Sequence, residues 1–117
     1  MRNVLLLLCL ALAGVMVACG SPSSKSQTPQ ATNSVTMAKS YKFEPAAIRV
    51  PVGATVTWTN QDNFTHNVHL LDGSDWRSEP LRPGQSVTHA FRKAGEYKYE
   101  CAFHPQNMKG TVLVEDS

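Results

Sequence analysis

Short runs of alternating apolar and polar residues, separated by turn signals, fill the chain from residue 34 to its end. Within Thr55–Thr59, threonines alternate with Val56 and Trp58, and within Glu96–Cys101, charged residues alternate with two tyrosines and a cysteine. No stretch repeats its apolar residues with the 3.6-residue period of a helix. Seven such runs occur, at residues 35–39, 48–50, 55–59, 66–71, 86–92, 96–101 and 110–114. The pattern predicts an all-β fold, a Greek-key sandwich or barrel of seven to eight strands.

The N-terminal segment has a different character. Arg2 is soon followed by sixteen residues without a charge, Val4–Cys19, which suits the apolar region of a signal peptide and is short for a spanning helix of about 20 residues. The ending Met16–Ser21 places an alanine before Cys19 and resembles a bacterial lipoprotein signal. This resemblance implies that residues 1–18 are a signal peptide and that Cys19 is lipidated. The domain would then be exported to the periplasmic or cell-surface side and tethered to a membrane. An uncleaved N-terminal anchor is the alternative.

Residues 19–33 are expected to form a flexible linker that begins with the lipidated cysteine. Past that cysteine the segment is rich in Ser, Thr, Pro and Gln and has Ala31 as its one aliphatic residue, so it cannot bury enough apolar surface to offset its ordering entropy. Residues 34–117 then form one folded domain. Without Arg2, ten basic residues face nine acidic ones, a net charge of +1. So small a net charge provides no broad electrostatic field that would attract nucleic acid. We also expect the protein to be a monomer.

Cys101 is expected to point into the domain. It shares a strand face with Tyr97 and Tyr99, opposite three charged residues, and burial of the tyrosines rather than the charges turns the cysteine inward. The chain has three cysteines, two of them in the N-terminal segment, so a disulfide framework is excluded. A single thiol kept in an exported domain is explained by metal binding, and an inert buried thiol is the plain alternative.

His66 is favoured over His69 as a partner of this cysteine. His66 alternates with Val68 and Leu70, so burial of that apolar pair turns its imidazole into the core. His69 falls on the opposite face of the same strand and would point away. His89 also alternates with apolar neighbours, and we interpret it as a structural histidine.

The loop after Cys101 supplies two further donors. His104 follows three residues on, Pro105 biases it away from helical dihedrals, and Met108 follows four residues later. One thiolate, two imidazoles and one thioether form a soft, mixed donor set. A trigonal His₂Cys site with a weak axial Met is the geometry of a blue-copper electron-transfer centre. We therefore predict one copper ion, alternating between Cu(I) and Cu(II), with four ligands: His66, Cys101, His104 and Met108.

Four short motifs between residues 35 and 115 match those of a known family. They are Phe43-x-Pro45-x-x-Ile48-x-Val50, Gly53-x-Thr55-Val56-x-Trp58-x-Asn60, His66-Asn67-Val68-His69 and Gly95-x-Tyr97-x-Tyr99-x-Cys101-x-x-His104-Pro105. With them the chain resembles a cupredoxin of the plastocyanin, pseudoazurin and amicyanin type. The resemblance implies that His66, Cys101 and His104 are strong equatorial ligands and Met108 the long axial one. It also implies that Asn67 helps to tie the two ligand-bearing segments together.

One spacing departs from the family. Three residues separate His104 from Met108, whereas amicyanin has two, and plastocyanin and pseudoazurin have four. This difference in loop length would affect the axial distance and the reduction potential. Gln106 is the alternative axial ligand, because an axial Gln occurs at such sites.

The resemblance implies a carrier of single electrons that is not an enzyme. Its partners would be redox proteins, such as a cytochrome, a respiratory complex or an oxidoreductase, and the lipid anchor would attach it to a membrane. His104 would lie near the surface as the electron route, with Phe103 and Pro105 beside it in an apolar docking patch. A copper carrier or storage lipoprotein is the alternative, and it would bind Cu(I) without a reversible Cu(II) state. A zinc-stabilised sandwich would have little use for Met108, and a small copper oxidase would need the open coordination position that Met108 fills.

Overall fold

The computed structural model describes residue 14 and residues 27–116. Cys19, the predicted lipidation site, lies outside the described residues, as does the predicted signal peptide except for Gly14. Within the described part, no helix is long and apolar enough to cross a membrane. These residues fold into nine β-strands, so the all-β prediction is confirmed.

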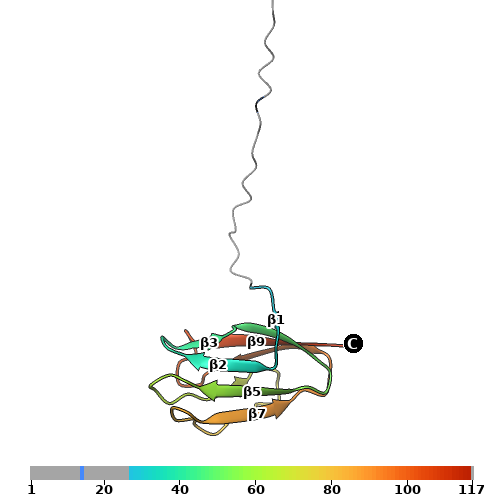
Figure 1. Ribbon diagram of the computed structural model, residues 1–117. Helices are drawn as coiled ribbons and strands as arrows, with labels where there is room; N and C mark the ends of the chain where they lie inside the picture. The colour runs from blue at the N-terminus through green and yellow to red at the C-terminus, as the bar shows by residue number, and fades with distance from the viewer. Residues whose placement is uncertain (1–13, 15–26, 117) are drawn as a thin grey trace, which may run out of the picture.

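The strands form two sheets that face each other (Figure 1). One sheet has five strands in the order β1-β4-β9-β8-β6, and the other has four in the order β3-β2-β5-β7. Both sheets mix parallel and antiparallel pairs. The strands are β1 (Gln30–Ala31), β2 (Ser34–Ala38), β3 (Lys42–Glu44), β4 (Ala47–Pro51), β5 (Thr55–Asn60), β6 (His69–Leu70), β7 (Ser86–Ala90), β8 (Gly95–Glu100) and β9 (Lys109–Glu115).

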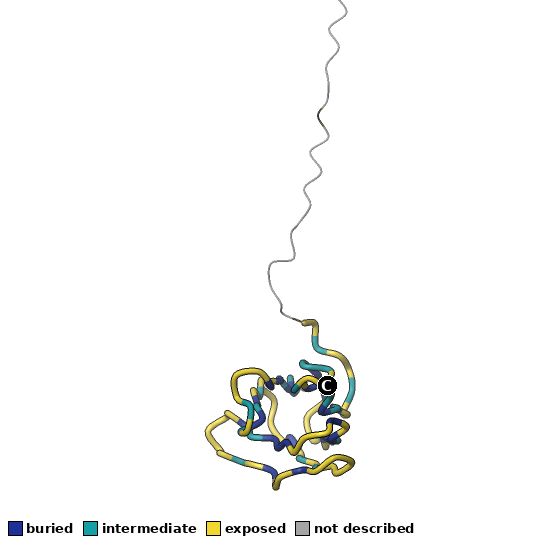
Figure 2. Tube along the Cα trace, turned by 90° about the vertical axis from the view of Figure 1, so that its left-hand side faces the viewer, coloured by how far each residue is buried: buried dark blue, intermediate teal, exposed yellow. Residues whose placement is uncertain are grey.

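The core lies between the sheets and follows the alternation of the strands. In β5, Val56 and Trp58 are fully buried while Thr55 is exposed, and in β8 the ring of Tyr99 is buried between two more accessible residues. Figure 2 shows the chain closing around this core. Trp58, Tyr99 and Phe91 are the largest buried side chains. Their burial fixes which face of β8 points inward, and Cys101, the next residue after this strand, follows the same parity.

Two strands are absent from the sequence-based expectation and one is shorter than expected. β1 lies within residues 30–33, the end of the predicted linker, and pairs in parallel with β4. β3 buries Phe43 alone, between two charged residues. β6 has two residues rather than the six expected, because His66 bonds to Leu81 instead: each accepts the other's N–H, at 2.7 and 3.1 Å. Residues 27–116 therefore form nine strands rather than seven or eight.

Candidate metal centre

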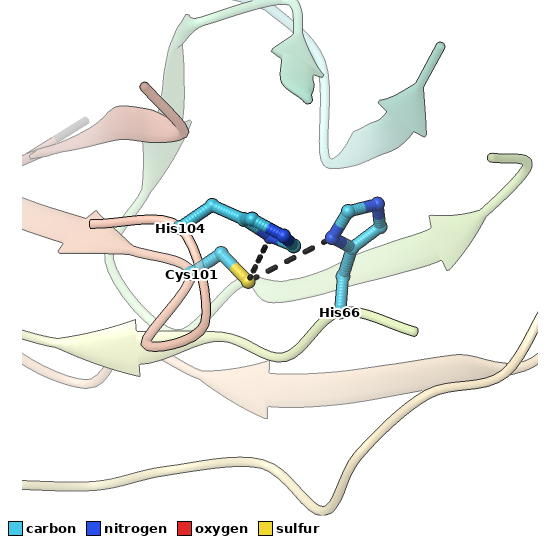
Figure 3. Close-up of side chains that lie close together, drawn as sticks. All are labelled: His66, Cys101 and His104. Atoms are coloured by element: carbon cyan, nitrogen blue, oxygen red, sulfur yellow. Dashed lines mark hydrogen bonds between the residues drawn. The ribbon is translucent and has the colours of Figure 1, made fainter. Parts of the chain in front are cut away.

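Three of the predicted donors meet at one point (Figure 3). Sγ of Cys101 lies 3.8 Å from Nδ1 of His66 and 3.7 Å from Nδ1 of His104, and the three donor atoms all lie within 4.8 Å of one another. Metal–sulfur bonds of about 2.3 Å and metal–nitrogen bonds of about 2.0 Å, set at the 120° of a trigonal site, put sulfur and nitrogen about 3.7 Å apart. The observed spacing therefore fits one ion bound by all three atoms.

The loop between β8 and β9 brings Met108 back to Cys101. The N–H of His104 donates to the carbonyl of Cys101 (3.1 Å), that of Met108 donates to the carbonyl of His104 (3.0 Å), and that of Cys101 donates to the carbonyl of Met108 (3.0 Å). Met108 is fully buried, whereas Gln106, the alternative axial residue, is exposed. The burial pattern of the loop therefore favours Met108 over Gln106 as the inward-facing side chain.

The loop before His66 is fixed by Asn60, a fully buried residue at the end of β5. Its Nδ2 donates to the carbonyls of Phe64 (2.7 Å) and Leu81 (2.8 Å), and its Oδ1 accepts from the N–H of Asp62 (2.9 Å). Buried polar groups must be satisfied in this way. The side-chain amide of Asn60 thus ties the loop before His66 to Leu81, the residue that pairs with His66.

Asp62 contacts the ring nitrogen of His66 that faces away from Cys101. Oδ2 of Asp62 lies 2.8 Å from Nε2 of His66, and both residues are buried. A proton on Nε2 leaves Nδ1 free to bind a metal, as a carboxylate partner commonly arranges. Burial by itself would raise the pKa of Asp62, but the hydrogen bonds from His66 and from the Asn63 amide outweigh it and hold the pKa below its usual value. Sequence reasoning missed this residue, whose signal is an acid four positions before the histidine.

Asn67 connects the two ligand-bearing segments. Its Oδ1 accepts a hydrogen bond of 2.8 Å from the N–H of Ala102, the residue after Cys101, and its side chain is buried. The bond joins the segment of His66 to the segment of Cys101. On the other side of the site, burial and the neighbouring His66 imidazole lower the pKa of His104, against the opposing effect of Asp62. A neutral imidazole is the form that binds a metal.

The remaining histidines lie outside this cluster. Nε2 of His69 contacts Asp75 at 2.7 Å, and its Nδ1 lies 3.6 Å from Glu100, so both ring nitrogens face carboxylates. His89 packs against Trp76, with ring centroids 4.2 Å apart. Burial lowers the pKa of His89, in keeping with a structural histidine.

Aromatic side chains surround the outer edge of the site. His104 is partly exposed, whereas His66 and Cys101 are fully buried. Phe64 and Phe103 are 53% and 51% exposed, high values for apolar rings. Tyr41 is less exposed than either of these rings and stacks on Phe64 with ring centroids 5.4 Å apart. The imidazole of His104 is therefore the one donor group of the cluster that reaches the surface, and it does so among apolar rings.

Comparison with known proteins gives a consistent result. A family model described as a cupredoxin-like domain matches residues 9–114. Amicyanin-alpha from Methylorubrum extorquens is 36% identical over 107 residues, which cover 88% of each chain. A purple cupredoxin structure from Nitrosopumilus maritimus is 32% identical with a TM-score of 0.65, and the match covers 72% of this chain and all of that one. A mutant amicyanin in the Cu(I) form is 36% identical with a TM-score of 0.65, covering 70% of this chain and 80% of that one.

Proposed function

The chain belongs to the cupredoxin-like family and transfers electrons with a single copper ion, and we propose that four side chains hold this ion as a type 1 centre: His66, Cys101, His104 and Met108. The observation that carries the proposal is the convergence of one sulfur and two imidazole nitrogens at the spacing of a trigonal site. The donor chemistry supports it as well. Thiolate and thioether suit Cu(I), and imidazole suits Cu(II), so the set accommodates both oxidation states.

Copper supplies the exchange of one electron, and the protein keeps the ligands in place while the charge changes. Backbone hydrogen bonds join Cys101, His104 and Met108 into one closed loop. The bond from Ala102 to Asn67 holds this loop against the segment of His66, and Asp62 fixes the ring of that histidine. Ligands held this firmly would move little between oxidation states, which is what fast electron transfer requires.

We propose that electrons enter and leave through His104. It is the cluster residue with solvent access, and the exposed rings of Phe64 and Phe103, together with Pro105, provide an apolar surface around it. A small, weak interface suits redox proteins that must separate quickly. The partners would be redox proteins such as a cytochrome, a respiratory complex or an oxidoreductase. A buried Met108 that completes the coordination leaves no position for a substrate, so the protein would act as a carrier and not as an enzyme.

We also propose that the carrier works outside the cytoplasm, tethered by lipidated Cys19. The support is the sequence alone, namely a charged start, sixteen uncharged residues and a small residue before the cysteine. β1 pairs with β4 and begins eleven residues after Cys19. An extended chain covers at most about 3.3–3.6 Å per residue, so such a tether would keep the copper domain within a few tens of ångströms of the membrane.

Addition of Cu(II) to the full chain in detergent tests the proposed centre. An intense visible thiolate-to-copper band should appear, bleach with ascorbate and return on oxidation with ferricyanide. The Cys101→Ser variant should lose the band. The matched Cys19→Ser variant should keep this band, yet lose the lipid that mass spectrometry should detect on residue 19 of the unmodified membrane-bound chain.

Two results would contradict these proposals separately. A colourless product, or a band that survives Cys101→Ser, would exclude the type 1 centre. Cu(I) binding without a reversible Cu(II) state would favour the copper carrier or storage protein instead. A membrane-bound chain whose Cys19 carries no lipid by mass spectrometry would exclude the lipid tether and leave the copper assignment intact.

A further inference from the structure

The turn between β2 and β3 holds two residues in a conformation that their side chains disfavour. Ser40 has φ 72° and Tyr41 has φ 59°, both in the left-handed region. Neither residue is glycine, and left-handed backbone at a bulky residue costs free energy. Such conformations persist where the surroundings determine them, and they cluster at functional sites. The contacts of the Tyr41 side chain are therefore a candidate reason for this disfavoured backbone conformation.

Tyr41 packs against both histidines of the metal centre. Its ring centroid lies 4.4 Å from that of His104, with an interplanar angle of 52°, and 5.9 Å from that of His66, which it meets edge-on. Phe64 also stacks on the ring of Tyr41, with an interplanar angle of 21°. Among the aromatic pairs of the described residues, Tyr41 is the one ring other than the two histidines themselves that contacts either imidazole.

The two histidines are supported differently. Asp62 holds the far nitrogen of His66 at 2.8 Å. For His104, the hydrogen bonds recorded within the described residues involve its ring only through Nδ1, which faces Sγ of Cys101. His104 is also the more exposed of the two. Rotation of its imidazole out of the site is therefore opposed by packing, and Tyr41 supplies the aromatic part of that packing.

We propose that Tyr41 is a positioning residue, whose ring, presented by the left-handed turn, holds the imidazole of His104 in its ligand orientation in both oxidation states. This inference rests on the proposed copper centre. The left-handed conformation is then what directs the ring onto the imidazole, since an extended residue at this position would project its side chain elsewhere. Aromatic pairs of this kind stabilise one arrangement beyond the contribution of their buried area.

Three variants distinguish the contribution of the Tyr41 ring from that of the backbone conformation of the turn. Tyr41→Asn removes the ring but tolerates the left-handed region, so the variant should fold. Tyr41→Phe keeps the ring and removes the hydroxyl. Ser40→Gly is the matched control, because it relaxes the same turn and leaves the ring in place.

The copper-loaded full chain in detergent is reduced, and its oxidation by ferricyanide is followed by stopped-flow absorbance. In Tyr41→Asn the rate should fall about two- to tenfold, the range that one aromatic pair provides, and the Cu(II) EPR spectrum should show a changed or second species. Tyr41→Phe and Ser40→Gly should stay within about twofold of the unmodified chain. In the copper-free Tyr41→Asn chain, NMR should show the His104 ring protons losing the ring-current shift of Tyr41 and averaging over more rotamers.

A purely structural role would give a different result. Tyr41→Asn would then change the unfolding midpoint and leave the oxidation rate, the EPR spectrum and the rotamer averaging of His104 unaltered, and that outcome overturns this inference. If the unmodified chain forms no blue Cu(II) species, the proposed function itself fails, so the two failures are distinguishable.

Discussion

His66 has a different partner at each ring nitrogen. Nδ1 faces the sulfur of Cys101, and Nε2 faces the buried carboxylate of Asp62. A carboxylate partner raises the basicity of a ligating imidazole and fixes its orientation, and loss of such partners typically weakens metal binding. The negative charge of Asp62 also favours the more highly charged Cu(II).

Asp62→Asn should lower the affinity for Cu(II) about 10- to 100-fold. The amide oxygen can still accept a hydrogen bond from Nε2 of His66, but it carries no negative charge to balance the positive charge of the metal. Competition with a chelator of known affinity measures the change. Asp75→Asn is the control, because Asp75 makes the same kind of contact with His69, outside the cluster. Equal losses in both variants would show that the effect does not come from the His66 contact.

Asn67→Ala should lower the free energy of unfolding of the copper-free chain by about 0.5–1.5 kcal/mol, the net contribution of one hydrogen bond, since the group that loses its partner is part-buried. The group concerned is the N–H of Ala102. Urea unfolding measures the change. Asn107→Ala, an exposed amide in the same loop, should shift the free energy by no more than about 0.5 kcal/mol. A loss in Asn67→Ala as small as that of the control would mean that the bond does not join the two segments.

At single residues, the sequence predicts side-chain direction where a strand supplies a period. The inward directions of Cys101 and His66 follow from their apolar neighbours, and both residues are fully buried. Asp62 and Tyr41 lie in turns, where no period exists. Their roles depend on contacts with residues distant in the chain, and no local pattern contains that information.

At the level of elements, β8 and β9 are in unusually close contact where Tyr99 lies opposite Gly110. A Cβ on Gly110 would overlap the phenol ring of Tyr99. Gly110→Ala should therefore lower the free energy of unfolding by about 1–3 kcal/mol, the usual cost of overpacking, as measured by urea unfolding. Because the overlap includes the hydroxyl, the double variant with Tyr99→Phe should lose less than the sum of the two single variants. Additive losses would place the strain elsewhere.

The strands with a clear alternation were predictable, and two of the three that differ from the prediction, β1 and β3, lack one. β1 consists of Gln30 and Ala31, and a polar pair of residues carries no signal of pairing. β3 has a single buried residue, too few for a period. β6 was overestimated because the alternation from His66 to Leu71 follows burial except at Asn67, which is buried, and the first residue, His66, bonds to Leu81 outside the nine strands. Burial pattern and strand pairing are separate properties, and only the first can be read from spacing.

For the whole molecule, the shifted titrations imply two losses of stability in acid. Burial lowers the pKa of His89 and of His104 below 6.5, so their contribution is complete above pH 6.5 and is lost as the pH falls through the folded values. Three carboxyls have pKa values lowered below 3.8: Asp62, where hydrogen bonds outweigh burial, Asp72, through Ser74, and Asp75, through His69. Their contribution is complete above pH 3.8 and is lost below it.

The urea midpoint of the copper-free chain should therefore fall in two stages between pH 7 and pH 3. Measurement of unfolding across this range checks the expectation. His89→Gln should reduce the first stage and change the second only slightly, through Asp72, because His89 is the last and smallest of the causes that lower the pKa of that carboxyl. A midpoint that rises as the pH is lowered from 6.5 to 5 would contradict the assigned directions of the two histidines.

The five-stranded sheet ends on both sides in a strand of two residues, β1 and β6. A strand that short offers few free amide and carbonyl groups to a neighbouring chain. Short edge strands are one way in which proteins avoid edge-to-edge aggregation of their sheets. Because β1 pairs with Ile48 and Arg49 of β4, part of the outer edge of that five-residue strand is also withheld from such pairing. Molecules crowded side by side could thus collide repeatedly along this sheet without fusing into a continuous ribbon.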